Sequence, residues 1–346
     1  MRANLFVFLS ACIAFVGYTV GYTVLSDENL KKLADLSQPS RLAVDGEFLK
    51  PLLVPRVSGT EGNERVRQFI TTMFHNLNWE VDNDTFTAHT PLGEKSFTNI
   101  IVTKQPDAPR RLVLAAHYDS KYFPDTDVEF IGATDSAVPC ALLIDLAHSL
   151  DSFLNQSSNT TLQIIFFDGE EAFDKWSETD SIYGSKHLAE KWDQSYIIRT
   201  DTPFMPATSK LDGIEVFILL DLIGAANSRI PNYFPTTSWL FNNFANLEKR
   251  LWSLPVLEDA GEGGHNEESY FSVDSVYSSL GGFIGDDHLP FLQRGVPIVH
   301  LIPYPFPSVW HTKEDNATAI DPPTVANWAI ILRTFVAEYL DLFKTK

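Results

Sequence analysis

The sequence predicts a single globular α/β domain, with a central twisted, mixed and mostly parallel sheet that carries helices on both faces. Three observations predict this fold class. Short apolar runs rich in β-branched and aromatic residues alternate along the chain with longer segments of helical periodicity. Several of the apolar runs end at acidic residues or histidine, as strands do at the ligand-binding edge of an α/β sheet. The chain has 346 residues and is 44% hydrophobic, which is enough to bury a substantial core.

The predicted elements follow one another in a regular alternation. In chain order we expect a helix over 64–77, strands over 79–86, 99–102 and 112–116, a helix over 138–150, a strand over 162–167, a helix over 184–192, a strand over 214–220, a helix over 238–251, a strand over 296–302 and a helix over 322–342. Two stretches, 200–211 and 259–287, show neither the apolar periodicity of a helix nor that of a strand. Long loops of this kind often border a functional site.

The first 25 residues differ from the rest of the chain. Residues 5–25 carry no charge and follow Arg2, which is typical of a signal peptide, although the stretch is also long enough to span a bilayer. The small residues Thr19 and Gly21 offer a cleavage site. We expect 1–25 to be a signal peptide or signal anchor and 26–346 to be the folded domain. The protein would then be secreted or, alternatively, anchored in the Golgi membrane.

Composition narrows the function classes. Acidic residues outnumber basic ones by 45 to 26, and the net charge of −19 argues against nucleic acid as a partner. Of the two cysteines, Cys12 lies in the leader, so a processed chain would keep Cys140 alone and form no internal disulfide. The chain carries four Asn-x-Ser/Thr sequons, which predict a glycoprotein in the secretory pathway: Asn83, Asn155, Asn159 and Asn316.

Two adjacent carboxylates, Glu170 and Glu171, directly follow the predicted strand 162–167. Neighbouring side chains point in different directions, so one of them can bind a metal while the other moves a proton. The alternative is an ordinary solvated acidic pair on a loop. The position after a buried strand favours a functional site.

Four further segments deliver metal-competent side chains near strand ends or helix starts. They carry His117 with Asp119, then Asp135, Asp221 and His311. Asp, Glu and His suit a catalytic zinc, which takes three protein ligands and keeps one position open. On its own, Asp135 is equally well explained as a helix N-cap. The sequence contains no Gly-x-Ser-x-Gly, His-Glu-x-x-His, P-loop or Cys-x-x-Cys motif.

With their flanking residues, these segments resemble the animal glutaminyl-peptide cyclotransferases (glutaminyl cyclases), which share the fold of zinc-dependent exopeptidases. The matching segments are 116–121, 132–140, 166–173, 180–188, 219–224, 286–298, 300–303 and 306–312. They are spread over nearly the whole chain beyond the leader. The resemblance implies that 26–346 is a glutaminyl cyclase-like catalytic domain.

The resemblance also implies an activity and a set of site residues. The activity is cyclisation of an N-terminal glutamine of peptides and proteins to pyroglutamate with release of ammonia, and it leaves slow cyclisation of N-terminal glutamate open. The implied cofactor is one Zn²⁺ per chain, and the implied state is a monomer with no obligate partner. The implied metal ligands are Asp135, Glu171 and His311, and Glu170 is the implied general base and acid. Asp221 and Asp286 are the implied buried acids that hydrogen-bond around Glu170 and the catalytic loop, and Trp176, Phe306 and Trp310 are the implied pocket walls.

One departure and two alternatives stand beside this interpretation. Secreted animal members of the family usually have two paired cysteines, at the positions that are Ala116 and Cys140 in this chain. Because position 116 is alanine here, Cys140 has no partner. A two-zinc aminopeptidase of the same fold would use the same types of ligand in the same order, so the ligands alone do not separate the two activities. A catalytically inactive binding protein on this scaffold is the second alternative, and the retention of every implied catalytic group argues against it.

Overall fold

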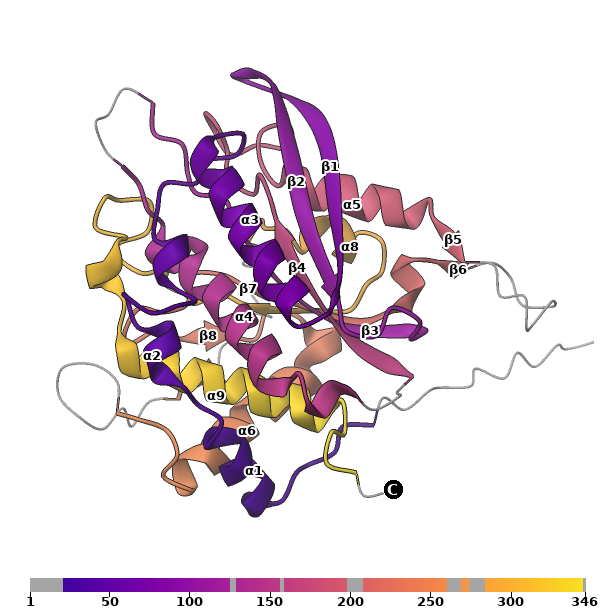
Figure 1. The fold of residues 1–346 in the computed structure, drawn as a ribbon, viewed down its shortest axis with the longest axis vertical. Helices are drawn as coiled ribbons and strands as arrows, with labels where there is room; N and C mark the ends of the chain where they lie inside the picture. The colour runs from indigo at the N-terminus through magenta and orange to yellow at the C-terminus, as the bar shows by residue number, and fades with distance from the viewer. Residues whose placement is uncertain are drawn as a thin grey trace, which may run out of the picture.

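A six-stranded sheet forms the centre of the protein (Figure 1). The computed structural model describes residues 21–124, 129–155, 159–197, 208–259, 269–273 and 284–344. The sheet has the order β1-β2-β4-β3-β7-β10, with β1 (Glu80–Thr90), β2 (Gly93–Thr103), β3 (Arg110–His117), β4 (Thr160–Phe167), β7 (Ile214–Leu220) and β10 (Ile298–Leu301). Strands β4, β3, β7 and β10 are parallel neighbours, whereas β2 is antiparallel to both β1 and β4.

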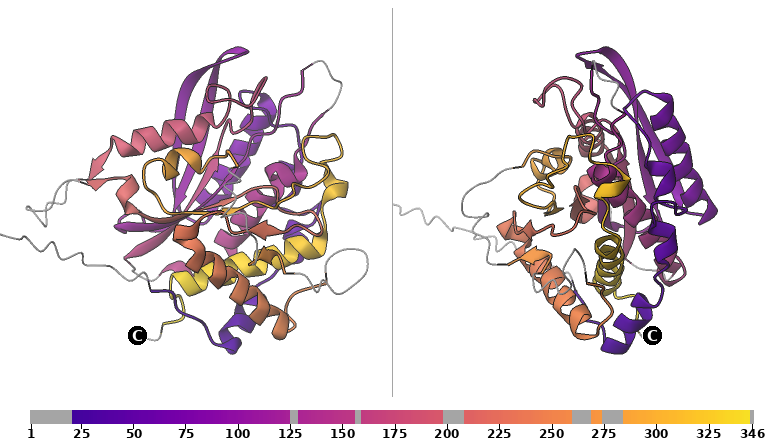
Figure 2. Two further views of the ribbon diagram at one scale, coloured as in Figure 1. Left: turned by 180° about the vertical axis from the view of Figure 1, so that it is seen from behind. Right: turned by 90° about the vertical axis from the view of Figure 1, so that its left-hand side faces the viewer.

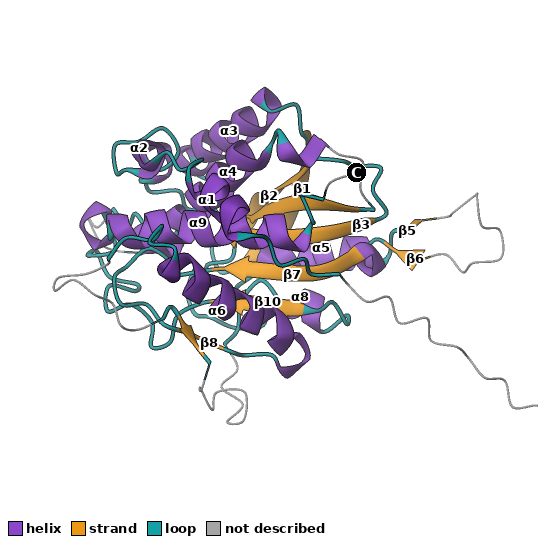
Figure 3. Ribbon diagram, turned by 90° about the horizontal axis from the view of Figure 1, so that it is seen from below, coloured by secondary structure: helices purple, strands orange, loops and turns teal. Residues whose placement is uncertain are grey.

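Helices cover both faces of this sheet (Figures 2 and 3). One face carries α3 (Glu61–Asn76), α4 (Val138–Leu150) and α9 (Pro322–Tyr339), with α1 (Asp27–Ala34), α2 (Pro39–Leu42) and α6 (Ser238–Ser253) packed against α9. The other face carries α5 (Tyr183–Asp193) and α8 (Leu289–Leu292). Alternate residues of β3 enter different cores, because Leu112 and Leu114 pack in the larger cluster while Val113 and Ala115 pack in the smaller one.

The predicted fold class is confirmed, since each predicted strand and helix is present with its ends within six residues of the prediction; the largest difference is at β2, which begins at Gly93 and not at residue 99. Helix α4 has the predicted bounds. Three short helices, α1, α2 and α8, were not predicted, nor were the two-residue strands β5 (Tyr196–Ile197), β6 (Thr208–Ser209), β8 (Ile230–Pro231) and β9 (Phe271–Ser272). These elements are too short for a periodic pattern to identify.

Parts of two predictions fall outside the described residues. Residues 1–20 of the predicted leader are among them, as are 200–207, 260–268 and 274–283 of the two unassigned stretches. Among the helices that the structure describes, none combines the length and apolar character needed to cross a membrane.

The segment before the predicted boundary at residue 26 already belongs to the folded body. The Tyr22 hydroxyl donates to Glu338 Oε2 at 2.5 Å, and the Leu25 N–H donates to Glu338 Oε1 at 2.9 Å. The Leu25 side chain is buried in the larger core. Arg250 adds an ion pair of 2.9 Å to the same Glu338 carboxylate. The N-terminal segment is therefore fixed to α9.

Cys140 is a buried free thiol in α4. Its Sγ donates to the carbonyl oxygen of His117, the neighbour of Ala116, at 3.1 Å. Burial raises the pKa of the thiol to about 12, so Cys140 stays protonated and unreactive.

Candidate active site

The candidate site lies where the parallel strands end. Because β3, β4, β7 and β10 run in the same direction, their carboxyl ends meet at one edge of the sheet. The residues that follow them there are His117 and Asp119 after β3, Glu170 and Glu171 after β4, Asp221 after β7, and His311 in the loop after β10. Asp135 reaches the same place from the turn that precedes α4.

Two buried carboxylates, which accept hydrogen bonds from backbone N–H groups, fix the turn that carries Glu170 and Glu171. Asp119 accepts the backbone N–H groups of both glutamates, at 3.1 Å through Oδ1 and 3.2 Å through Oδ2. Asp168, at the start of the turn, accepts from the backbone N–H of Thr98 at 2.8 Å. Gly169, between Asp168 and Glu170 in the sequence, has a φ of +75°, and an added Cβ would lie 2.5 Å from the Phe97 ring. Only glycine fits this position without strain.

Asp135, Glu171 and His311 form a group whose ligand atoms face one another. His311 Nε2 lies 3.3 Å from Asp135 Oδ2 and 3.2 Å from Glu171 Oε1. These two carboxylate oxygens are buried and have no well-formed hydrogen bond. Bonds of about 2.0–2.1 Å in a tetrahedral zinc site separate ligand atoms by about 3.3 Å. The donor set and its spacing therefore fit a zinc ion.

The charges at this group also favour a cation. Burial opposes a charge on His311, but the carboxylates of Asp135 and Glu171 outweigh burial and raise its pKa to about 9. Burial likewise opposes ionisation of Asp135, yet its hydrogen bond with His117 and the contact with His311 lower its pKa. A metal ion bound by the three side chains would take the place of the His311 proton.

A second group, His117, Asp135 and Asp221, is closed by internal hydrogen bonds. His117 Nε2 lies 3.0 Å from Asp135 Oδ1 and 3.4 Å from Asp221 Oδ1. Asp221 Oδ1 also accepts from the Ser136 hydroxyl, and from the Leu222 N–H at 2.8 Å. Burial raises the pKa of Asp221 to about 6. These three side chains are also spaced closely enough to hold a metal ion, but Asp221 Oδ1, the oxygen nearest His117 Nε2, already accepts two other hydrogen bonds.

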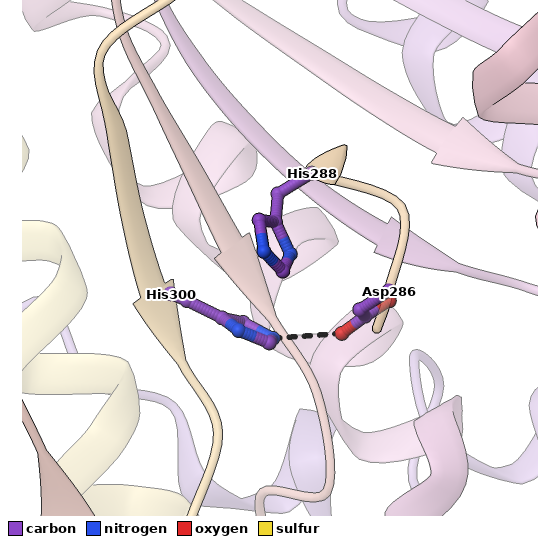
Figure 4. A group of neighbouring side chains, drawn as sticks. All are labelled: Asp286, His288 and His300. Atoms are coloured by element: carbon purple, nitrogen blue, oxygen red, sulfur yellow. Dashed lines mark hydrogen bonds and ion pairs between the residues drawn. The ribbon is translucent and has the colours of Figure 1, made fainter. Parts of the chain in front are cut away.

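A third group consists of Asp286, His288 and His300 (Figure 4). His300 Nε2 and Asp286 Oδ2 are 2.7 Å apart, and Asp286 Oδ1 accepts the Asp287 N–H at 2.6 Å. The His288 ring packs on the His300 ring with 4.3 Å between centroids. The Nε2–Oδ2 distance is that of a short hydrogen bond and is too short for two ligands of one zinc ion. We therefore interpret this group as a buried hydrogen-bonded pair.

The metal-competent group opens into a cavity of about 510 Å³. Its lining combines three aromatic side chains with the acids of the site: Lys121, Asp135, Glu170, Glu171, Trp176, Asp221, Leu222, Ile284, Gly285, Ile302, Phe306, Trp310 and His311. The rings of Trp310 and His311 stack at 4.0 Å, and Phe306 meets Trp310 edge-on at 4.8 Å. Trp176 is 46% exposed and Trp310 is 39% exposed, although both are large apolar side chains. Such exposure suits contact with a ligand better than core packing.

Glu170 is the buried acid that faces the cavity beside the metal-competent group. Burial raises its pKa well above the ordinary glutamate range, and the charges of Glu171, Asp286 and Asp287 act in the same direction. A carboxyl group tuned in this way can both take and return a proton near neutral pH.

Asp221 and Asp286 are both buried near Glu170, but no hydrogen bond that the described residues form joins either of them to the Glu170 carboxyl group directly. Asp221 bonds to Ser136 and Leu222 instead, and Asp286 acts on Glu170 through its charge.

Comparison with known proteins identifies the family. The model of peptidase family M28 matches residues 99–336. The glutaminyl-peptide cyclotransferase-like protein of Mus musculus is 44% identical, over 92% of this chain and 80% of the mouse protein. The glutaminyl-peptide cyclotransferase of Drosophila melanogaster is 42% identical, over 96% of this chain and 90% of the fly protein. The chain belongs to the glutaminyl-peptide cyclotransferase family.

A solved structure agrees with this assignment. The crystal structure of Macrostomum lignano glutaminyl cyclase superposes with a TM-score of 0.82 at 36% identity, and the match covers 93% of this chain and 95% of that chain. The resemblance inferred from the motifs, and the zinc exopeptidase-like fold that it implied, are thus confirmed for this member of the glutaminyl-peptide cyclotransferase family.

The structure brings most of the predicted site residues of this family member to one cavity. Asp286 does not line the cavity, because it is buried and hydrogen-bonded to His300. His117 and Asp119 were candidate metal-competent residues without an assigned role, and the structure places them in the hydrogen bonds around the site, whereas Leu222 and Ile302 line the cavity without having been predicted. His117 and Asp119 follow a predicted strand and carried a visible signal, whereas Leu222 and Ile302 look like ordinary core residues in the sequence.

Gly169→Ala should destabilise the protein by more than the cost of its positive φ alone. The new Cβ would meet the Phe97 ring as well as strain the backbone, so we expect a loss of about 2–4 kcal/mol in the free energy of unfolding. Gly93→Ala is the matched control, because Gly93 has a φ of +88° but open space around it. Urea unfolding of both variants measures the difference. Equal losses would show that Phe97 does not constrain the turn.

Proposed function

We propose that this protein converts the N-terminal glutamine of peptides and proteins to pyroglutamate with release of ammonia, and that it uses one zinc ion held by Asp135, Glu171 and His311. The observation that carries the proposal is the pair of buried carboxylate oxygens without hydrogen-bond donors that face His311 Nε2. Family membership supports the substrate, because the similar proteins are named as glutaminyl-peptide cyclotransferases. A zinc ion bound there would polarise the side-chain amide of the substrate.

The side chains of the cavity then divide the remaining work. The α-amine of the substrate attacks its own side-chain amide carbon, so a new C–N bond forms and the bond to the amide nitrogen breaks. The Glu170 carboxylate takes a proton from the attacking amine and delivers it to the departing ammonia. Trp176, Phe306 and Trp310 exclude water and hold the glutamine side chain folded back toward the amine.

The contacts of His117 and Asp221 favour the cyclase over the two-zinc aminopeptidase. An aminopeptidase would need His117 and Asp221 as ligands of a second metal. In this chain His117 Nε2 is engaged with Asp135 and Asp221, and Asp221 Oδ1 accepts from Ser136 and Leu222. A second zinc would have to compete with these buried hydrogen bonds, each worth roughly 1 kcal/mol.

The purified protein should release ammonia from a peptide that begins with glutamine and should contain one zinc per chain. The control substrate is the same peptide beginning with asparagine, which is one methylene shorter and would have to close a four-membered ring, so no product is expected. Mass spectrometry and elemental analysis give the two results. Two tightly bound zincs, together with hydrolysis of leucine amide, would establish the aminopeptidase instead.

Variants at Glu170 and His311 should separate proton transfer from metal binding. Glu170→Gln should lower kcat by about 100- to 10,000-fold and keep zinc, because the amide cannot accept the proton. His311→Ala should lose zinc, because one of three ligands is gone. Exposed Glu190→Gln and His89→Ala serve as controls that keep both properties. An active Glu170→Gln enzyme would exclude the proton-transfer role.

We further propose that the protein is secreted, as a glycosylated monomer. The leader would end at Gly21, because the small residues Thr19 and Gly21 permit cleavage there and because Tyr22 and Leu25 are bonded to Glu338. Residues 22–346 would then form the mature catalytic domain.

The N-terminal sequence of the secreted chain should begin at Tyr22. Peptide-N-glycosidase treatment should reduce its mass, and an intact N-terminus retained in a membrane fraction would establish the anchored form.

A further inference from the structure

A fully buried arginine, Arg56, lies beneath the candidate metal site. It precedes α3 in sequence, and its side chain has no solvent exposure. Among the described residues its guanidinium forms no ion pair and binds backbone carbonyl oxygens. The acceptors are the carbonyls of Tyr118 at 2.8 Å, Leu52 at 3.2 Å, Val54 at 3.4 Å, Gly132 at 2.9 Å, Asp135 at 3.2 Å and Ile131.

These carbonyls belong to the two loops that build the site. Tyr118 lies between His117 and Asp119, and Asp119 in turn holds the backbone of the glutamate pair. Ile131, Gly132 and Asp135 belong to the turn before α4, and Asp135 offers one of the three metal-competent atoms. A single guanidinium therefore joins the loop after β3 to the turn that carries a proposed ligand.

Two further features constrain the backbone of the same turn. Gly132 has a φ of +57°, and a Cβ there would lie 2.2 Å from the Asp135 carbonyl oxygen, so the turn is tightly closed. The Asp315 carboxylate accepts the Thr134 N–H at 2.8 Å. Asp315 lies in the loop that follows His311, so it connects two of the proposed ligand segments.

Only arginine offers the donors that this position uses. Its planar guanidinium carries five N–H groups in a rigid fork, whereas the lysine ammonium offers three donors at one point. Burial lowers the pKa of Arg56, and the charges of Asp119, Asp135 and Asp315 partly offset that effect. The surrounding carbonyl dipoles satisfy the buried cation without using a carboxylate that the metal needs.

We propose that Arg56 is a positioning residue for the metal: by fixing the backbone of Tyr118, Gly132 and Asp135, it sets the Asp135 carboxylate at ligand distance from His311 and Glu171. This inference rests on the proposed zinc site. It assigns Arg56 no contact with the substrate. Groups that orient metal ligands typically change metal affinity by about 10- to 100-fold when they are removed.

The test is zinc affinity, measured by competition with a chromophoric chelator in the absence of substrate. Arg56→Met should raise the zinc Kd by about 10- to 100-fold, and Arg56→Lys should raise it less. Excess zinc should restore most of the lost activity of Arg56→Lys. Wild-type affinity in Arg56→Met would contradict the proposal, and if that variant does not fold, wild-type affinity in Arg56→Lys would do so.

Arg333→Met is the matched control. Arg333 is also fully buried, and it binds the Leu33 carbonyl at 2.7 Å and Asp145 at 2.9 Å, away from the cavity. Its loss should lower stability and leave the zinc Kd within about twofold of wild type, since it touches no residue of the metal site. Equal weakening of zinc binding in both variants would mean that Arg56 acts only through general stability.

The chelator assay also separates the two proposals. Zinc binding by the wild type without pyroglutamate formation would contradict the function alone. Pyroglutamate formation together with unchanged zinc affinity in the Arg56 variants would contradict only the role of Arg56.

Discussion

The concentration of buried negative charge at the carboxyl edge of the sheet is the constraint on which the rest of the structure depends. Eight acids are buried there within a few residues of strand ends or turns: Asp119, Asp135, Asp168, Glu170, Glu171, Asp221, Asp286 and Asp287. An ionised carboxylate costs several kcal/mol to bury unless donors or a cation compensate it. The fold must therefore supply a compensating group for each acid or let that acid keep its proton.

The protein solves this problem differently for different acids, and the solutions define their roles. Asp119 accepts backbone N–H groups, so it serves as a fixed anchor. Glu170 has a raised pKa, which makes it an acid that can exchange a proton. Asp135 and Glu171 keep oxygens that only His311 and a cation can compensate. On our proposal an anchor, a proton carrier and a metal site thus all arise from carboxylate side chains, and the donors around each carboxylate decide its role.

The sequence revealed those parts of the molecule that have a repeating or local signature. Helices α3 and α4 and the parallel strands follow from apolar periodicity, and Glu170, Glu171 and Asp221 stand out because each follows an apolar run. Arg56 and Asp315 could not be found in this way. Both act on backbone groups of other segments, and those partners lie 62–79 residues away from Arg56 and 181 residues away from Asp315. A residue that recognises carbonyl or N–H groups leaves no matching side-chain pattern elsewhere in the sequence.

The same limit explains why ligand types alone do not distinguish a cyclase from a peptidase on this scaffold. The chain offers His117, Asp135, Glu171, Asp221 and His311 in the order that the two-zinc aminopeptidase would use, and the cyclase interpretation draws its three zinc ligands from the same set. What can separate them is which ligand atoms already have hydrogen-bond partners in the folded chain. Ser136 and Leu222 donate to Asp221, and His117 lies between Asp221 and Asp135. On our proposal these hydrogen bonds reduce a two-metal ligand set to one. On the same proposal Glu170 would move the proton of an attacking amine, whereas the aminopeptidase interpretation requires a metal-activated water molecule as the attacking group.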